Sequence, residues 1–137
     1  DTRYALPALM VMTIWRNMGT LMIIFLAGLQ AIPEELKEAA AIDGASKWRT
    51  FRSITLPLLK PTILLGAVLL SVAYLQFFEE SFVMTQGGPL DSTLSAAYYI
   101  YQKFGFGQYG IASAASWVLF GIIALVSVLQ SRILKED

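Results

Sequence analysis

Polar side chains that could bind a solute share one face of an apolar segment near the N-terminus. The segment runs from about residue 6 to residue 32, and its first half is interrupted by Thr13, Arg16, Asn17 and Thr20. Their spacing of i, i+3, i+4 and i+7 puts them on one side of an α-helix. The rest of that helix is apolar, so we expect this face to point toward protein or a water-filled path rather than toward lipid.

A second set of such side chains lies in the apolar segment from about residue 62 to residue 84. Tyr74, Phe77 and Phe78 recur there at helical spacing. Hydrogen-bonding side chains and aromatic faces suit a solute that has hydroxyl groups and apolar C–H patches. The two faces together therefore form a candidate solute path. The predicted path residues are Thr13, Arg16, Asn17, Tyr74 and Phe77.

Two structural interpretations stand beside solute binding for these residues. Arg16 could extend toward the membrane surface and form an ion pair with Glu79 or Glu80. The aromatic side chains between Tyr74 and Phe78 could serve helix packing alone.

Residues suited to catalysis or metal binding are scarce. The chain contains no Cys and no His, which excludes thiol nucleophiles, disulfides, imidazole bases and the usual zinc sites. No Walker A pattern occurs, so ATP is not bound by that route. Glu79 and Glu80 are adjacent, and a regular helix points them in different directions, so a membrane enzyme with a carboxylate pair is poorly supported. We expect neither catalysis nor a bound metal or cofactor in this chain.

The composition indicates how these residues are positioned. Of the 137 residues, 56% are hydrophobic and 15% are charged, whereas soluble domains carry about 25% charged residues. The apolar residues fall in blocks of about 20, enough to cross a bilayer core of ~30 Å. We predict an all-α, polytopic transmembrane protein with spans at about 6–32, 62–84 and 110–131, rather than a soluble helical protein. The formal net charge is zero, so nothing indicates nucleic-acid binding.

One long polar segment, residues 33–61, separates the first two spans. Pro33 fits the first position of a helix whose first turn is acidic, and Gly44 fits the left-handed residue that ends it. Ser46 is a reasonable N-cap for a second short helix that runs to about residue 56. Pro57 and Pro61 then predict a bend into the membrane.

The distribution of Lys and Arg sets the predicted orientation. The 33–61 segment holds five of the ten Lys and Arg residues, and residues 85–109 hold only Lys103. The positive-inside rule places the 33–61 loop and the C-terminus, with Arg132 and Lys135, in the cytoplasm. The aromatic 85–109 loop, with a short interfacial helix at about 92–104, then lies outside. The chain begins at Asp1 without Met, and three spans would start it outside, so we expect further spans upstream.

The polar segment also carries a motif at fixed spacing. Its marker positions are Glu38, Ala39, Ala40, Asp43, Gly44, Ala45, Ile54, Leu56 and Pro57. This pattern resembles the EAA loop of the membrane-spanning subunits of ABC importers. The sequences AGLQAIPEEL before the loop and MTQGGP after the second span resemble carbohydrate-importer permeases. The second of these favours the type related to the larger maltose-importer permease chain, and the whole chain resembles the C-terminal half of such a permease.

The resemblance implies a function and a set of partners. It implies a permease subunit of an ATP-driven importer that moves a sugar or oligosaccharide across a bacterial or archaeal cytoplasmic membrane. A dimer of partner ATPase subunits would bind ATP and Mg²⁺. A second permease chain and an extracytoplasmic solute-binding protein would complete the system. The helix around Glu38 to Gly44 would be the coupling helix, whose small Ala side chains enter a cleft on the ATPase while Glu38 meets a basic residue.

Other interpretations remain for the function and for the loop. An importer for a phosphorylated polyol or a polyamine would share the EAA loop. A channel or structural membrane protein without an ATPase partner would leave transport energetics independent of this loop. Residues 33–61 could also be an amphipathic segment that only lies on lipid.

Overall fold

The computed structural model describes residues 2–135, with side chains described as far as residue 133, and this part of the chain is helical with no strand. The long helices are α1 (Thr2–Gln30), α4 (Leu56–Leu75) and α6 (Tyr109–Lys135). Shorter elements are α2 (Glu34–Ile42), α3 (Lys47–Thr50), α5 (Ala96–Gly105) and the π-helical turns η1 (Phe51–Thr55) and η2 (Ser81–Thr85). The all-α, multi-span prediction is confirmed.

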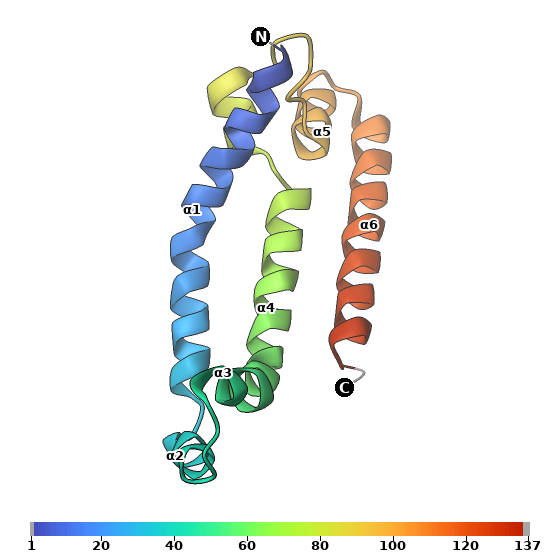
Figure 1. The fold of residues 1–137 in the computed structure, drawn as a ribbon. Helices are drawn as coiled ribbons and strands as arrows, with labels where there is room; N and C mark the ends of the chain where they lie inside the picture. Colours follow the sequence, from blue (N-terminus) through green and yellow to red (C-terminus); the bar gives the residue numbers. More distant parts are fainter. Residues whose placement is uncertain (1, 136–137) are drawn as a thin grey trace.

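Three described helices are long and apolar enough to cross a membrane: Thr2–Gln30, Lys47–Leu75 and Tyr109–Ile133. The three stand side by side, with α4 between α1 and α6 and packed against both (Figure 1). Helices α2 and α3 lie at the end where α6 finishes, and α5 lies at the opposite end. The predicted alternation of the two loops between the ends of the bundle therefore matches the architecture.

Helices α1 and α4 pack closely at two glycines, one on each helix. A Cβ added to Gly28 of α1 would lie 2.5 Å from the Thr62 hydroxyl oxygen and 2.8 Å from its methyl group. A Cβ added to Gly66 of α4 would lie 3.3 Å from the Leu21 side chain and 3.6 Å from the Phe25 ring, which is a looser fit. In lipid, helices associate through close packing, because the lipid tails are as apolar as the helices. These contacts hold the first two spans together.

The polar segment folds locally as its capping residues predict. Gly44 has φ +73°, and the amides of Gly44 and Ala45 donate hydrogen bonds to the carbonyls of Ala41 and Ala40. This is a Schellman arrangement, which ends α2. The Ser46 hydroxyl then accepts a hydrogen bond from the Arg49 amide and caps α3. Both helix boundaries follow from local chemistry.

The junction with the membrane differs from the prediction. Helix α3 ends at Thr50, and the chain continues through the π-helical turn η1 directly into α4. Pro57 is the second residue of α4, and Pro61 lies inside the helix. The turn η1 therefore separates α3 from α4. Pro33, predicted as the first residue of its helix, is instead the N-cap residue that precedes α2.

The second span ends earlier than predicted. The expected helix over residues 62–84 ends at Leu75, and Gln76 is its C-cap. Two long-range contacts favour this break, because Glu79 and Glu80 bind Arg16 of α1 and the Ser81 hydroxyl donates to a distant backbone carbonyl. The helix predicted at about 92–104 is α5, which starts at Ala96.

Aromatic rings and buried hydroxyls order the segment between α4 and α6. Each pair of ring centroids in one cluster lies 5.3 to 6.3 Å apart. The cluster consists of Phe78, Phe82, Tyr98 and Tyr101. Nearby, the Thr93 hydroxyl lies 2.7 Å from the Thr85 hydroxyl and donates to the Gly88 carbonyl. The segment is therefore a packed unit that fixes where α5 begins.

The close approach at Gly28 gives a direct test of the packing. We expect Gly28→Ala to destabilise the protein by about 1–3 kcal/mol, because the added methyl group overpacks the contact with Thr62. Gly19→Ala is the matched control, since a Cβ at Gly19 has nothing within 4 Å and should only gain helix propensity. The measurement is the thermal unfolding midpoint of the detergent-purified chain. Thr62→Ala should rescue Gly28→Ala, and equal midpoints for the two glycine variants would contradict the assignment.

Candidate functional site

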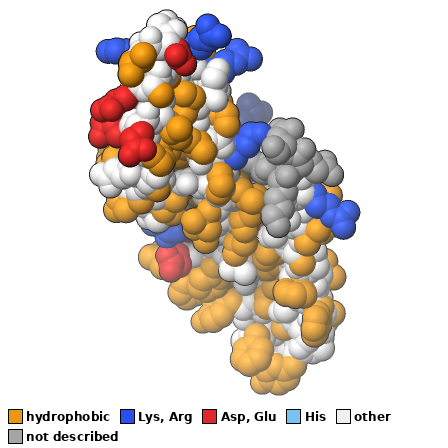
Figure 2. All heavy atoms as spheres, turned by 90° about the horizontal axis from the view of Figure 1, so that it is seen from below, with side chains coloured by type: hydrophobic (Ala, Val, Ile, Leu, Met, Phe, Trp, Pro, Cys, Tyr) orange, Lys and Arg blue, Asp and Glu red, His pale blue; other side chains and the backbone are white. Residues whose placement is uncertain are grey.

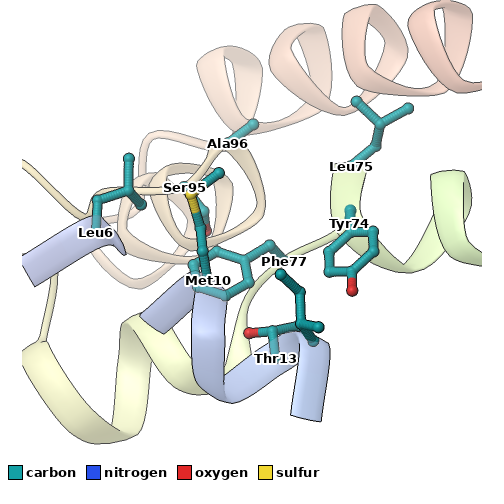
Figure 3. A pocket seen from close by; sticks show the side chains of 9 residues that line it. Leu6, Met10, Thr13, Tyr74, Leu75, Phe77, Ser95 and Ala96 are labelled. Atoms are coloured by element: carbon teal, nitrogen blue, oxygen red, sulfur yellow. The ribbon is translucent and has the colours of Figure 1, made fainter. Parts of the chain in front are cut away.

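A cavity of about 500 Å³ opens between α1, the end of α4 and the start of α5. Figure 3 shows Met10 and Thr13 of α1 pointing toward the same space as Tyr74 and Phe77. The lining residues are Leu6, Met10, Thr13, Ile14, Tyr74, Leu75, Phe77, Ser95 and Ala96. Three of the five predicted path residues, Thr13, Tyr74 and Phe77, therefore meet in one cavity.

The cavity combines aromatic faces with few polar groups. Tyr74 is 38% exposed, and its ring and that of Phe77 offer flat surfaces for apolar C–H groups. The Thr13 hydroxyl donates to the Leu9 carbonyl at 2.8 Å, so only its lone pairs are left to accept a hydrogen bond. The hydroxyl groups of Tyr74 and Ser95 add further polar atoms. No charged side chain lines the cavity, so the arrangement suits an uncharged molecule.

Arg16 and Asn17 do not line this cavity. One terminal nitrogen of Arg16 lies 2.8 Å from a carboxylate oxygen of Glu79 and 2.8 Å from one of Glu80. The ion pair is the alternative that the sequence left open for Arg16. The Asn17 amide donates to the Thr13 carbonyl at 2.9 Å. Both side chains thus have partners inside the protein, and their proposed contact with solute stays a prediction.

The ion pair joins partners of unequal exposure. The Glu80 side chain is 4% exposed, whereas the side chains of Glu79 and Arg16 are 75% and 49% exposed. Removing the guanidinium would leave the Glu80 carboxylate buried without a counter-charge, which is costly. Arg16 therefore fixes the chain after α4 against α1, directly beside the cavity.

Sequence reasoning missed the contribution of Ser95 and Ala96. These residues come from the start of α5, and the fold of the segment between α4 and α6 brings them to the cavity. The Ser95 hydroxyl accepts a hydrogen bond from the Tyr98 amide at 3.1 Å and caps α5. A serine before a helical stretch predicts a cap, but no local pattern predicts proximity to α1.

The first part of the loop motif forms α2 and its C-terminal turn. Glu38 and Ala39 are exposed, whereas Ala40 is buried. Asp43 and Gly44 are exposed at the turn. Among the described residues no cation forms an ion pair with Glu38. This carboxylate is therefore available to a partner.

The second part of the motif lies at the foot of the second span. Ile54 is half-buried in η1, and Leu56 and Pro57 begin α4. Ala45, half-buried, lies in the turn between α2 and α3. The helix that carries Leu56 and Pro57 at one end carries Tyr74, a cavity residue, near the other. Over its 20 residues, a helix spans about 30 Å. Helix α4 thus connects the motif to the cavity.

No described group of His, Cys, Asp and Glu side chains has the arrangement of a metal site. Glu79 and Glu80 lie together, but both lie against the Arg16 guanidinium. The positive charge of the guanidinium already neutralises these carboxylates and would repel a metal cation.

A comparison with protein families matches residues 2–135 to the binding-protein-dependent transport system inner membrane component family. Among individual proteins, the chain is 42% identical over 133 residues to the multiple sugar-binding transport system permease protein MsmF of Streptococcus mutans. That alignment covers 96% of this chain and 46% of MsmF.

Two further relatives carry names of sugar transport systems. The chain is 37% identical over 126 residues to the trehalose/maltose transport system permease protein MalF of Thermococcus litoralis, covering 92% of the chain and 43% of the relative. It is 36% identical over 140 residues to the lactose transport system permease protein LacF of Rhizobium radiobacter, covering 99% and 47%. The chain therefore spans slightly less than half the length of these relatives.

The Arg16 ion pair can be tested through stability. We expect Arg16→Gln to destabilise the chain by about 1–3 kcal/mol, because the buried Glu80 carboxylate loses its counter-charge. Glu79→Gln is the control and should change stability little, since exposed ion pairs contribute about 0–1 kcal/mol. The measurement is the unfolding midpoint in detergent. Recovery in the Arg16→Gln/Glu80→Gln double variant would support the assignment, and equal losses in Arg16→Gln and Glu79→Gln would oppose it.

Proposed function

This chain belongs to the binding-protein-dependent transport system inner membrane component family, and on that premise we propose that it is a permease subunit of an ATP-driven ABC importer for a sugar or oligosaccharide. The single observation that carries the proposal is the arrangement of α4. This helix has the EAA-type loop at one end and an aromatic, uncharged cavity at the other. The names of the three relatives support a sugar as the solute.

The chain acts as a transport subunit, and the chemistry of ATP belongs to its partners. A dimer of ATPase subunits binds ATP and Mg²⁺ and receives α2 in a cleft. Exposed Glu38 pairs there with a basic residue, while the Ala39 face allows close approach. Closure of the ATPase dimer moves α2 and α3, and the continuous helical path through η1 carries that movement into α4. The chain is thereby coupled to ATP hydrolysis without performing it.

The cavity supplies part of the sugar path. Tyr74 and Phe77 pack against the C–H face of a sugar ring, the Thr13 hydroxyl accepts a hydrogen bond from a sugar hydroxyl, and the Ser95 hydroxyl donates one. A second permease chain supplies the facing half, and an extracytoplasmic solute-binding protein delivers the sugar. The distribution of Lys and Arg supports a cytoplasmic position for the loop and the C-terminus. The membrane is the cytoplasmic membrane of a bacterium or archaeon, as for an inner membrane component.

The cavity also bears on the alternative solutes. A phosphorylated polyol requires cationic side chains, and a polyamine requires anionic ones. The residues that line the cavity include neither. Arg16, the cation beside it, is occupied by two carboxylates. A neutral sugar therefore suits the cavity better than either charged solute.

Tyr74 provides a test of sugar binding. We expect Tyr74→Ala to raise the half-saturating sugar concentration for uptake by about 2–10-fold, because one aromatic face is lost at about 0.5–1.5 kcal/mol. Tyr74→Phe should retain most of the affinity. Phe120→Ala is a matched control, since Phe120 is exposed on α6 and does not line the cavity. The measurement is uptake of radiolabelled maltose, trehalose and lactose into cells that hold the complete system. Unchanged kinetics in Tyr74→Ala would contradict the assignment.

Glu38 provides a test of coupling to the ATPase. Glu38→Lys should reduce ATP-driven uptake at least about tenfold, because reversing one charge of a close interfacial pair costs 2–5 kcal/mol or more. Glu34→Lys is the control, since Glu34 is an exposed carboxylate in the first turn of the same helix. The measurements are uptake in energised vesicles and co-purification of the ATPase subunits. Full uptake by Glu38→Lys would favour a channel or structural protein that needs no ATPase.

A further inference from the structure

The stretch Lys47–Arg52 gathers cationic and aromatic side chains at the surface. Lys47, Arg49 and Arg52 are exposed, and among the described residues none of them forms an ion pair. Trp48 and Phe51 are 68% and 42% exposed. Their rings stack on each other, with centroids 5.7 Å apart and an angle of 27° between the planes. Large exposed aromatic rings beside unpaired cations require a partner with both an apolar and an anionic part.

The depth of this stretch points to the lipid headgroups. Helix α4 alone, with 20 residues, spans about 30 Å, which matches the hydrocarbon core. The residues before it, in α3 and η1, are continuous with α4 and therefore extend into the headgroup region. Figure 1 shows α3 at the foot of the long helices and α2 farther out. Trp, Lys and Arg are enriched at that depth because the aromatic ring is amphipathic and lipid phosphates are anionic.

Charge is divided between the two short helices. The α2 region holds four carboxylates and only one cation, Lys37. The carboxylates are Glu34, Glu35, Glu38 and Asp43. The Lys47–Arg52 stretch holds three cations and no carboxylate. Figure 2, which views this end of the molecule, shows acidic side chains gathered along one edge. An anionic surface therefore attracts the Lys47–Arg52 stretch and repels α2.

We propose that Lys47–Arg52 is a binding site for anionic phospholipid headgroups. The guanidinium groups of Arg49 and Arg52 donate hydrogen bonds to the phosphate, Lys47 adds a point charge, and the stacked rings of Trp48 and Phe51 lie at the glycerol level. Lipid then holds α3 at the membrane surface, while repulsion keeps α2 turned toward the cytoplasm. The loop is thereby divided into a lipid-bound part and a part free for a protein partner. This site is independent of the solute that the protein transports.

Fluorescence of Trp48 tests the site. The full chain with Trp15→Phe and Trp117→Phe keeps Trp48 as its only tryptophan. It is reconstituted in phosphatidylcholine vesicles that contain equal fractions of either brominated phosphatidylglycerol or brominated phosphatidylcholine. We expect stronger quenching by phosphatidylglycerol, and about a fivefold loss of this preference for each cation changed to Gln, from about 1 kcal/mol per charge. The test variant is Lys47→Gln/Arg49→Gln/Arg52→Gln.

A matched variant controls for overall charge. Arg3→Gln/Lys103→Gln/Arg132→Gln removes the same number of cations from other helices and should keep the preference for phosphatidylglycerol. Salt gives a test that needs no charge variant, because raising the ionic strength from about 0.1 M to about 1 M shortens the Debye length from about 10 Å to about 3 Å. The preference should then disappear.

Two results would overturn the proposal. One is equal quenching by the two brominated lipids at low salt. The other is a preference that survives in the triple Lys47, Arg49 and Arg52 variant while ATPase subunits no longer co-purify with it, which would assign these cations to the protein partner. Loss of sugar uptake has no bearing on either measurement, so failure of this proposal and failure of the proposed transport function are distinguishable.

Discussion

The bilayer core offers no hydrogen-bonding partners, so polar groups of the spans depend on partners within the protein. Thr13 and Asn17 each bond a backbone carbonyl of their own helix, four residues earlier. Gln130 of α6 donates to the Ser71 hydroxyl of α4 at 2.6 Å and links the two spans. Arg16 differs because it is charged, and the carboxylates that neutralise it come from a segment far along the chain. These four polar side chains therefore either bond their own helix or join two elements.

Helix α4 is where these fixed contacts converge. In the first half of α4, Thr62 and Gly66 pack against α1. At its upper part, Ser71 bonds α6, and the chain just beyond its end bonds Arg16 of α1. The two outer spans are thus held through the central one. Movement of α4 relative to α1 or α6 must break a close contact, which favours discrete arrangements over gradual deformation.

Local chemistry predicted much of the fold, and long-range contact decided the rest. The turn at Gly44 and the cap at Ser46 follow from residues a few positions apart, and both were predicted. The end of α4 was not, because residues 62–84 are apolar enough to continue a helix and the break depends on Arg16, more than fifty residues away. The cavity was predicted in part for the same reason. Helical spacing identified Thr13 and Tyr74, but only the folded chain brings Ser95 to them.

The two ends of α4 have a common feature that bears on how this helix can move. A π-helical turn, Phe51–Thr55, precedes the helix, and another, Ser81–Thr85, follows it after a short break. Such turns interrupt the regular hydrogen-bond ladder and often occur at functional sites. Between them, 20 α-helical residues form a rod that includes Pro61 without a break. A displacement of the loop between α1 and α4 then moves this rod as one body, and the change of angle falls at the two junctions. Because Tyr74 and Leu75 end that rod, they move with it, whereas Thr13 stays with α1. The cavity therefore changes shape whenever α4 moves.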